Sequence, residues 1–246
     1  TNDNHNTWDI GIDELGYLHI LGDMHNGKSD AEVGNDPRYT GQTALYWVST
    51  QPLSIDGFEF VGNHPDRKIP CRQPTYYNFT TDLYGKLYFC TRVRSAIGHQ
   101  PGEVCYGLYK YNSGTRRWSV IGELPPKNDG KTKVLFYTEG GHNDQSVPPF
   151  WYQYGMTTLR FDLDNNLHFG TAWALGTDGP RPNRLVYAMS RDGGASWERA
   201  DGSPVSLPMD TQGPNSIDTG LRNIGGFERI QGQTHPLIDI NGVPTI

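Results

Sequence analysis

One short pattern occurs three times in the sequence, and this repeat limits the fold more than any other feature. Each copy places Asp, Gly or Asn turn residues before a strand of alternating apolar residues, as in a β-hairpin. A second pair of strands is predicted after each copy, so the repeating unit has about four strands. The three copies are Asp13-Glu-Leu-Gly-Tyr-Leu18, Asp82-Leu-Tyr-Gly-Lys-Leu87 and Asp162-Leu-Asp-Asn-Asn-Leu167.

Four-stranded units in tandem predict an all-β fold, a β-propeller, because closing such units into a ring protects most strand edges. The units fall at about 1–70, 71–145 and 146–225, and another starts at 226–246. Residues 1–246 thus predict a partial β-propeller domain. Rings of this kind close with about four to eight blades, so the remaining blades are expected from the rest of a longer protein or from a second chain. An open sandwich of about a dozen strands is the alternative, but it leaves the repeating order unexplained.

The most specific motif is structural. Residues 190–197 read Ser-Arg-Asp-Gly-Gly-Ala-Ser-Trp and match the Asp-box pattern Ser-x-Asp-x-Gly-x-Ser/Thr-Trp. In such a hairpin the Asp side chain caps backbone amides of the turn and the Trp packs beneath it. Asp192 is therefore predicted to be structural, and residues 112–118 read as a degenerate copy of the same motif.

Composition excludes several classes of partner. The net charge is −6 and no basic run is present, so nucleic acid is not an expected partner. No apolar run reaches the length of a membrane span, so no membrane segment is expected either. The three cysteines show no metal-type spacing; Cys90 and Cys105 could be bridged across a hairpin, leaving Cys71 free. The N-glycosylation sequon at Asn78 falls inside a predicted strand.

Hairpin geometry brings together residues that suit proton transfer beside an anion. Residues a few places before a turn lie beside residues a similar distance after it. This pairs His5 with His25, and Tyr76 with Arg92 or Arg94, at one rim of the propeller. Each has a plainer interpretation: His5 as a loop residue and Tyr76 as a core residue. His19 and His168 occupy matching strand positions and are predicted to be scaffold, whereas His142 lies in a Gly-rich loop.

These residues resemble a known family. Asp3-Asn-His5-Asn6, Gly22-Asp-Met-His25-Asn26, Thr75-Tyr76 and Arg92, followed by a late Asp-box, are similar to the Asp-box (BNR-repeat) propeller polysaccharide lyases, which include ulvan lyases and rhamnosyl-glucuronate lyases. The resemblance runs over nearly the whole chain but covers about half of a family member, and it implies a seven-bladed ring when complete. The chain departs from the family at Tyr76-Tyr77, where Tyr-Pro is frequent, and after Arg92, where Arg-Asp-Gly-Gly is frequent.

The resemblance implies a polysaccharide lyase that cleaves a uronic-acid glycan by β-elimination. Arg92 would neutralise the uronate carboxylate, His5 or His25 would be the base, and Tyr76 would be the acid or both acid and base. No cofactor is required, although a structural calcium or zinc ion is compatible with such propellers. An acidic polysaccharide substrate implies a secreted or periplasmic protein. A sialidase-like hydrolase and a non-catalytic glycan-binding propeller are the alternatives. Residues expected to contact substrate are Asn6, Asn26, Arg94, His142 and Tyr154.

Overall fold

The computed structural model describes residues 8–22, 45–71, 74–94, 104–125, 132–137, 151–153, 158–175, 184–222, 237–238 and 244–245. Over these residues the protein is all-β, with strands joined by turns and loops. The predicted all-β class is therefore confirmed. No helix that could cross a membrane occurs in this part of the chain.

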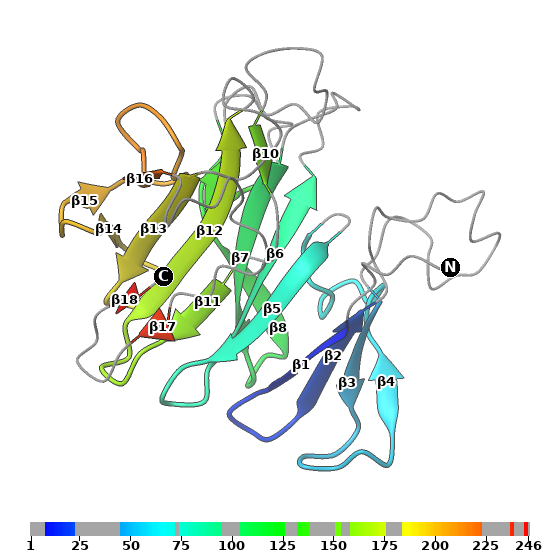
Figure 1. The fold of residues 1–246 in the computed structure, drawn as a ribbon. Helices are drawn as coiled ribbons and strands as arrows, with labels where there is room; N and C mark the ends of the chain where they lie inside the picture. The colour runs from blue at the N-terminus through cyan, green and yellow to red at the C-terminus, as the bar shows by residue number, and fades with distance from the viewer. Residues whose placement is uncertain are drawn as a thin grey trace, which may run out of the picture.

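The strands form consecutive antiparallel sheets that lie side by side (Figure 1). The first sheet has the order β1 (Trp8–Ile12), β2 (Leu18–Gly22), β3 (Tyr46–Ser49) and β4 (Phe58–Phe60). The second contains β5 (Thr75–Thr81), β6 (Leu87–Arg94), β7 (Val104–Asn112) and β8 (Arg117–Ile121), with β9 (Phe136–Tyr137) also paired to β7.

The third sheet is built around two long strands, β12 (Leu167–Leu175) and β13 (Arg184–Ser190). Strands β17 (Leu237–Ile238) and β18 (Pro244–Thr245) pair as a separate hairpin. The other strands of the third sheet are β10 (Trp151–Gln153), β11 (Thr158–Phe161), β14 (Trp197–Arg199), β15 (Pro204–Val205) and β16 (Asp218–Arg222).

The repeated aspartate shapes its turn in the same way in all three sheets. Its Oδ1 accepts hydrogen bonds from the backbone amides two and four residues later: Leu15 and Tyr17 for Asp13, Tyr84 and Lys86 for Asp82, and Asp164 and Asn166 for Asp162. The residue three places after each aspartate has a positive φ, which explains why Gly16, Gly85 and Asn165 stand there. The repeat is thus an Asp-capped hairpin turn.

A buried Asp–His–Tyr chain follows this turn in the first and third sheets. His168 is fully buried; its Nε2 lies 3.0 Å from Asp162 Oδ2 and its Nδ1 lies 2.7 Å from the Tyr187 hydroxyl. His19 is equally buried, 2.5 Å from the Tyr46 hydroxyl, but its Nε2 is 3.5 Å from Asp13 Oδ2, which is long for a hydrogen bond. Both histidines hold turn and neighbouring strand together, so their predicted scaffold role is confirmed.

Hydrogen bonds between sheets recur at one position, four residues before the repeated aspartate. Asp9 Oδ2 on β1 accepts from the Phe79 amide on β5 at 2.5 Å. Asn78 Oδ1 on β5 accepts from the Leu159 amide on β11 at 3.1 Å. The Asn78 carboxamide also donates to the Phe79 carbonyl at 3.1 Å. Asn78 is thus engaged in the interface between two sheets, which disfavours its use as a glycosylation site.

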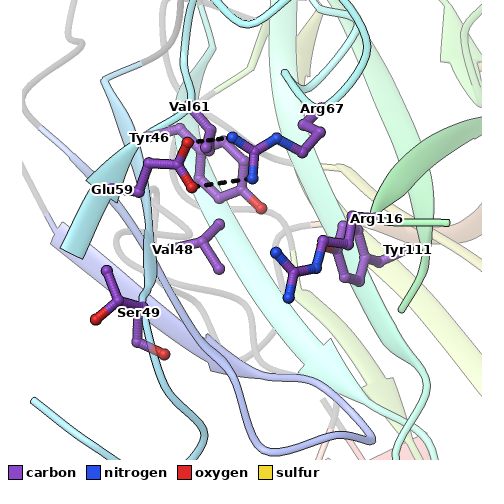
Figure 2. A pocket seen from close by; sticks show the side chains of 9 residues that line it. Tyr46, Val48, Ser49, Glu59, Val61, Arg67, Tyr111 and Arg116 are labelled. Carbon is purple, nitrogen blue, oxygen red and sulfur yellow. Dashed lines mark hydrogen bonds and ion pairs between the residues drawn. The ribbon is translucent and has the colours of Figure 1, made fainter. Parts of the chain in front are cut away.

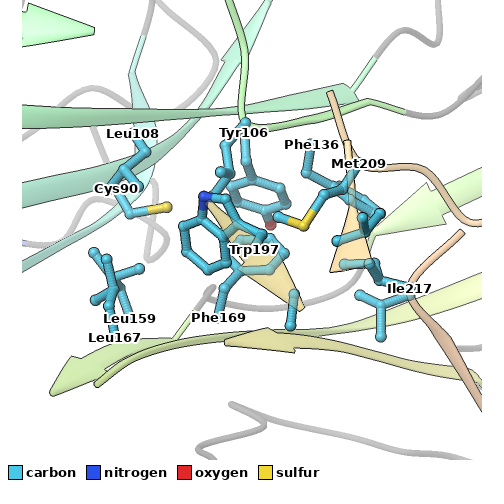
Figure 3. Close-up of a cluster of buried hydrophobic side chains, with 14 of the residues drawn as sticks. Cys90, Tyr106, Leu108, Phe136, Leu159, Leu167, Phe169, Trp197, Met209 and Ile217 are labelled. Carbon is cyan, nitrogen blue, oxygen red and sulfur yellow. The ribbon is translucent and has the colours of Figure 1, made fainter. Parts of the chain in front are cut away.

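The second sheet is buried on both faces, because each face packs on a neighbouring sheet. Figure 3 shows the cluster between the second and third sheets, in which Cys90, Tyr106, Phe169 and Trp197 meet. The other face places Phe89, Tyr109 and Trp118 against the first sheet. Neighbouring sheets with apolar faces in contact are the arrangement of propeller blades.

The Asp-box forms the predicted turn between β13 and β14. Asp192 Oδ1 accepts from the Ser196 amide and the Ser190 hydroxyl, each at 2.8 Å. The Trp197 indole is buried and donates to the Gly194 carbonyl at 3.1 Å. The structural role predicted for Asp192 is confirmed. In the degenerate copy Asn112 Oδ1 accepts from the Thr115 amide at 2.9 Å.

The structure decides against a bridge between Cys90 and Cys105, which the sequence had left open. Cys90 is paired with Leu108 and Cys105 with Val93, so the two cysteines are three ladder positions apart and point to opposite faces of the sheet. Cys105 packs beside Cys71 in a different apolar cluster from Cys90, and none of the three cysteines forms a disulfide. Burial raises the pKa of Cys71 and Cys90 well above the ordinary range, so these thiols stay protonated at neutral pH.

We expect Asn78→Ala to lower the free energy of unfolding of the complete protein by about 1–2 kcal/mol, because the Leu159 amide loses its acceptor. Asn78→Asp keeps an acceptor, as Asp9 does at the equivalent position of β1, and should lose less. Urea unfolding of the three proteins measures the difference. Equal stability of Asn78→Ala and wild type would show that this bond contributes nothing.

Because of His19, the free energy of unfolding is also expected to decrease as the pH is lowered. Burial lowers the pKa of His19 below its ordinary 6.5, more than Asp13 raises it. Between the two pKa values the unfolded chain binds the extra proton, so the contribution of His19 is complete above about pH 6.5 and is lost as the pH falls. His19→Gln should flatten the pH dependence of urea unfolding between about pH 7 and pH 5. Parallel profiles for variant and wild type would contradict this.

Candidate functional site

The candidate site lies at the ends of β5 and β6 opposite the Asp82 turn. Thr75 is paired with Arg92 and Asn78 with Cys90, so β5 has one residue more than β6 between these pairs. The extra residue is a β-bulge, in which Tyr76 has a φ of 53°. A positive φ is unfavourable for a bulky residue. Bulges of this kind redirect side chains and are frequent beside active sites.

The bulge separates two adjacent tyrosines. Tyr77 is 2 % exposed and packs in the core toward the first sheet. Tyr76 is half-buried, and the guanidinium carbon of Arg92 lies 4.4 Å from the centre of its ring. This is a cation–π contact, which orients both side chains. Tyr76 is therefore not the core residue of the plainer interpretation.

Two threonines hold the pair in place. Arg92 Nε donates to Thr75 Oγ1 at 2.8 Å, and the buried Thr91 hydroxyl lies 3.0 Å from the Thr75 carbonyl, to which it donates. A guanidinium has five N–H donors, of which the bond to Thr75 uses one. A guanidinium fixed at Nε can present its fork to a carboxylate in a bidentate manner. The positioning role of Thr75 was not predicted, because the sequence Thr-Tyr-Tyr does not indicate that a β-bulge forms there.

The hairpin thus brings Tyr76 and Arg92 together, as its geometry predicts. Arg94 lies on the same strand, where its backbone pairs with Val104. The roles of all three in binding or catalysis stay predictions. The remaining candidates, His5, Asn6, His25, Asn26, His142 and Tyr154, lie outside the described residues.

No metal centre accompanies this pair in the part of the chain that the structure describes. Among those residues, no three His, Cys, Asp or Glu side chains gather as a ligand set. The structural calcium or zinc ion stays a prediction. Among the described residues, one pocket lies beside Arg116 and another between Tyr137 and residues 208–215. The Tyr76–Arg92 pair is identified by its geometry.

Several solved structures share this fold. A polysaccharide lyase of family PL25, an ulvan lyase bound to -[GlcA(1-4)Rha3S]-, aligns with a TM-score of 0.63 and 18% identity over 98% of this chain and 50% of its own. The polysaccharide lyase Uly1 aligns with a TM-score of 0.57 and 16% identity over 87% of this chain and 46% of its own. The chain therefore has a fold of the β-propeller type and spans about half the length of these relatives.

Sequence comparison gives the family. No curated protein matches the chain. The BNR repeat-containing family matches it over residues 1–246, from the first residue through the Asp-box and beyond. The expected membership of an Asp-box, or BNR-repeat, propeller family is confirmed by this match together with the lyase structures. The chain belongs to the BNR repeat-containing family.

Proposed function

We propose that the complete protein is a polysaccharide lyase that cleaves a uronic-acid glycan, ulvan-like or with a rhamnose–glucuronate linkage, by β-elimination. The observation that carries the proposal is the Arg92 guanidinium held against the Tyr76 ring by Thr75. A fixed cation beside a phenol suits the chemistry of a uronate, in which an anion and a departing oxygen lie close together. The polysaccharide lyase structures of the same fold support the class of reaction.

The reaction removes the proton at C5 of the uronate and expels the oxygen at C4. Arg92 neutralises the carboxylate, so that the negative charge developing in the enolate-like intermediate is stabilised. Tyr76 gives its phenolic proton to the departing oxygen. The electron pair of the C5–H bond forms the new C4–C5 double bond as the C4–O bond breaks. The products are an unsaturated uronate and a free hydroxyl group.

The base at C5 is proposed to be His5 or His25. The described ladder of β1 and β2 runs from Ile12 opposite Leu18 to Trp8 opposite Gly22. The predicted pairing of His5 with His25 lies outside the described residues. A neutral imidazole has the basicity that a general base needs near neutral pH. Asn6, Asn26, Arg94, His142 and Tyr154 are proposed to bind substrate.

The complete ring is proposed to include blades beyond those described. Alternate residues of β1, Trp8, Ile10 and Ile12, are 59%, 58% and 39% exposed, whereas Gly11 between them is buried. An apolar face of this size favours a partner sheet over water. We propose that another blade of the complete protein packs there. Because large acidic glycans occur outside the cytoplasm, the protein is proposed to be secreted or periplasmic.

Tyr76→Phe is the sharpest test of the acid. The variant keeps the ring beneath Arg92 but loses the hydroxyl, so turnover should fall by about 10²–10⁴-fold with unchanged thermal stability. The assay follows ultraviolet absorbance of the unsaturated uronate formed from ulvan or a glucuronate-rich gum. The matched control is Tyr84→Phe, since Tyr84 is 75% exposed in the turn at the other end of the hairpin. Near-normal turnover of Tyr76→Phe would remove Tyr76 from the reaction.

Arg92→Lys and Arg92→Ala test charge neutralisation separately from geometry. Loss of the guanidinium should lower kcat/KM by about 10²–10³-fold or more, on the scale of lost oxyanion donors. Lysine keeps a charge but not the fork, so Arg92→Lys should fall between wild type and Arg92→Ala. The same absorbance assay reports both, with circular dichroism to verify folding. An Arg92→Ala protein that is folded and fully active would contradict the assignment.

A further inference from the structure

The pocket beside Arg116 lies at the end of the sheets opposite Tyr76. It is about 120 Å³ in volume and lies between the first sheet and the turn that joins β7 to β8 (Figure 2). Val48 and Val61 give it apolar walls, and Tyr111 and Arg116 close it from the second sheet. The pocket has room for several water molecules or for one small polyatomic ion.

The charges that line the pocket do not cancel. Arg67 and Glu59 form a two-bonded ion pair, with Arg67 Nη1 donating to Glu59 Oε2 at 3.0 Å. Arg116 is the other charged residue of the lining, so the lining carries one positive charge in excess. No ion pair joins Arg116 to a carboxylate among the residues that the structure describes. Its neighbour Arg117, in contrast, is paired with Asp66 at 3.3 Å and does not line the pocket.

The Arg116 side chain is held in a defined position. Its guanidinium lies 5.0 Å from the centre of the Tyr17 ring, and Nη2 donates to the Tyr17 hydroxyl at 3.2 Å. Figure 2 shows the guanidinium pointing between Val48 and Tyr111, into the pocket. Arg116 also has a φ of 55°, an unfavourable backbone conformation for a residue with a long side chain. Such outliers are more frequent at binding sites than elsewhere.

A neutral hydrogen-bond donor stands beside this cation. Burial raises the pKa of Tyr111 to about 12; the Asp13 carboxylate also raises it, whereas Arg116 and Arg67 lower it. Tyr111 therefore remains a protonated phenol at neutral pH. A guanidinium, a phenol and partly apolar walls are what a small oxyanion requires, because charge-assisted hydrogen bonds are stronger where water is partly excluded.

We propose that this pocket is a binding site for one carboxylate or sulfate group, held by Arg116 and Tyr111 at the end of the propeller opposite Tyr76. The group is either a free small anion or part of an acidic glycan. Because the site is distinct from the Tyr76–Arg92 pair, the proposal does not depend on the lyase reaction. The pocket would bind an anion without taking part in catalysis.

The test compares Arg116→Gln with its neighbour Arg117→Gln in the complete protein. Sulfate, acetate and glucuronate are titrated calorimetrically at constant ionic strength, with chloride as the reference salt. Wild type and Arg117→Gln should bind at least one of these anions saturably. Arg116→Gln should bind it about 10-fold or more weakly, as expected for loss of a hydrogen bond from a charged group. Arg116→Gly is a second variant, since glycine accepts a positive φ and so removes the guanidinium without backbone strain.

The outcomes separate the sources of the anion. Saturation by free sulfate or acetate supports a small-anion site, whereas binding that requires glucuronate supports a glycan site. Equal weakening by Arg116→Gln and Arg117→Gln would overturn the proposal, because only general electrostatics would then be at work. Absence of saturable binding to wild type by all of these ligands would overturn it as well.

Discussion

The structure depends first on an aspartate that caps its own turn. Asp13, Asp82 and Asp162 each bind the amides two and four residues later, which fixes the hairpin and therefore the register of the strands on both sides. A shift of one residue would turn every side chain to the other face of the sheet. The apolar faces that join neighbouring sheets, and the position of Tyr76 relative to Arg92, both follow from that register.

The sequence was most informative where the determinants are local. The Asp-capped turns, the Asp-box at Asp192 and the burial of His19 and His168 could all be predicted, because each is specified within a few residues by turn chemistry and alternation. The contact of Tyr76 with Arg92 followed from counting outward from the Asp82 turn. Counting did not predict the bulge that makes Thr75 the partner of Arg92. With two tyrosines in succession, the sequence does not show which of them falls in the bulge.

Interactions between sheets were harder to foresee for the same reason. The bonds from Asp9 to Phe79 and from Asn78 to Leu159 join residues far apart in sequence. The cysteines show the limit clearly: Cys90 and Cys105 lie on adjacent strands, but the parity of the register puts them on opposite faces.

The unfavourable backbone conformation of Tyr76 has a different meaning. Such strain persists where the surroundings impose it, and it is typical of sites kept for function rather than stability.

Product chemistry is the most direct test of whether the complete protein makes an unsaturated sugar. Wild-type protein would be incubated with ulvan and with rhamnose-capped glucuronate gums while ultraviolet absorbance and reducing ends are followed together. We expect both to rise in step on at least one glycan, since elimination creates one double bond for each linkage broken. Reducing ends that rise without a rise in absorbance would show hydrolysis and would rule out β-elimination.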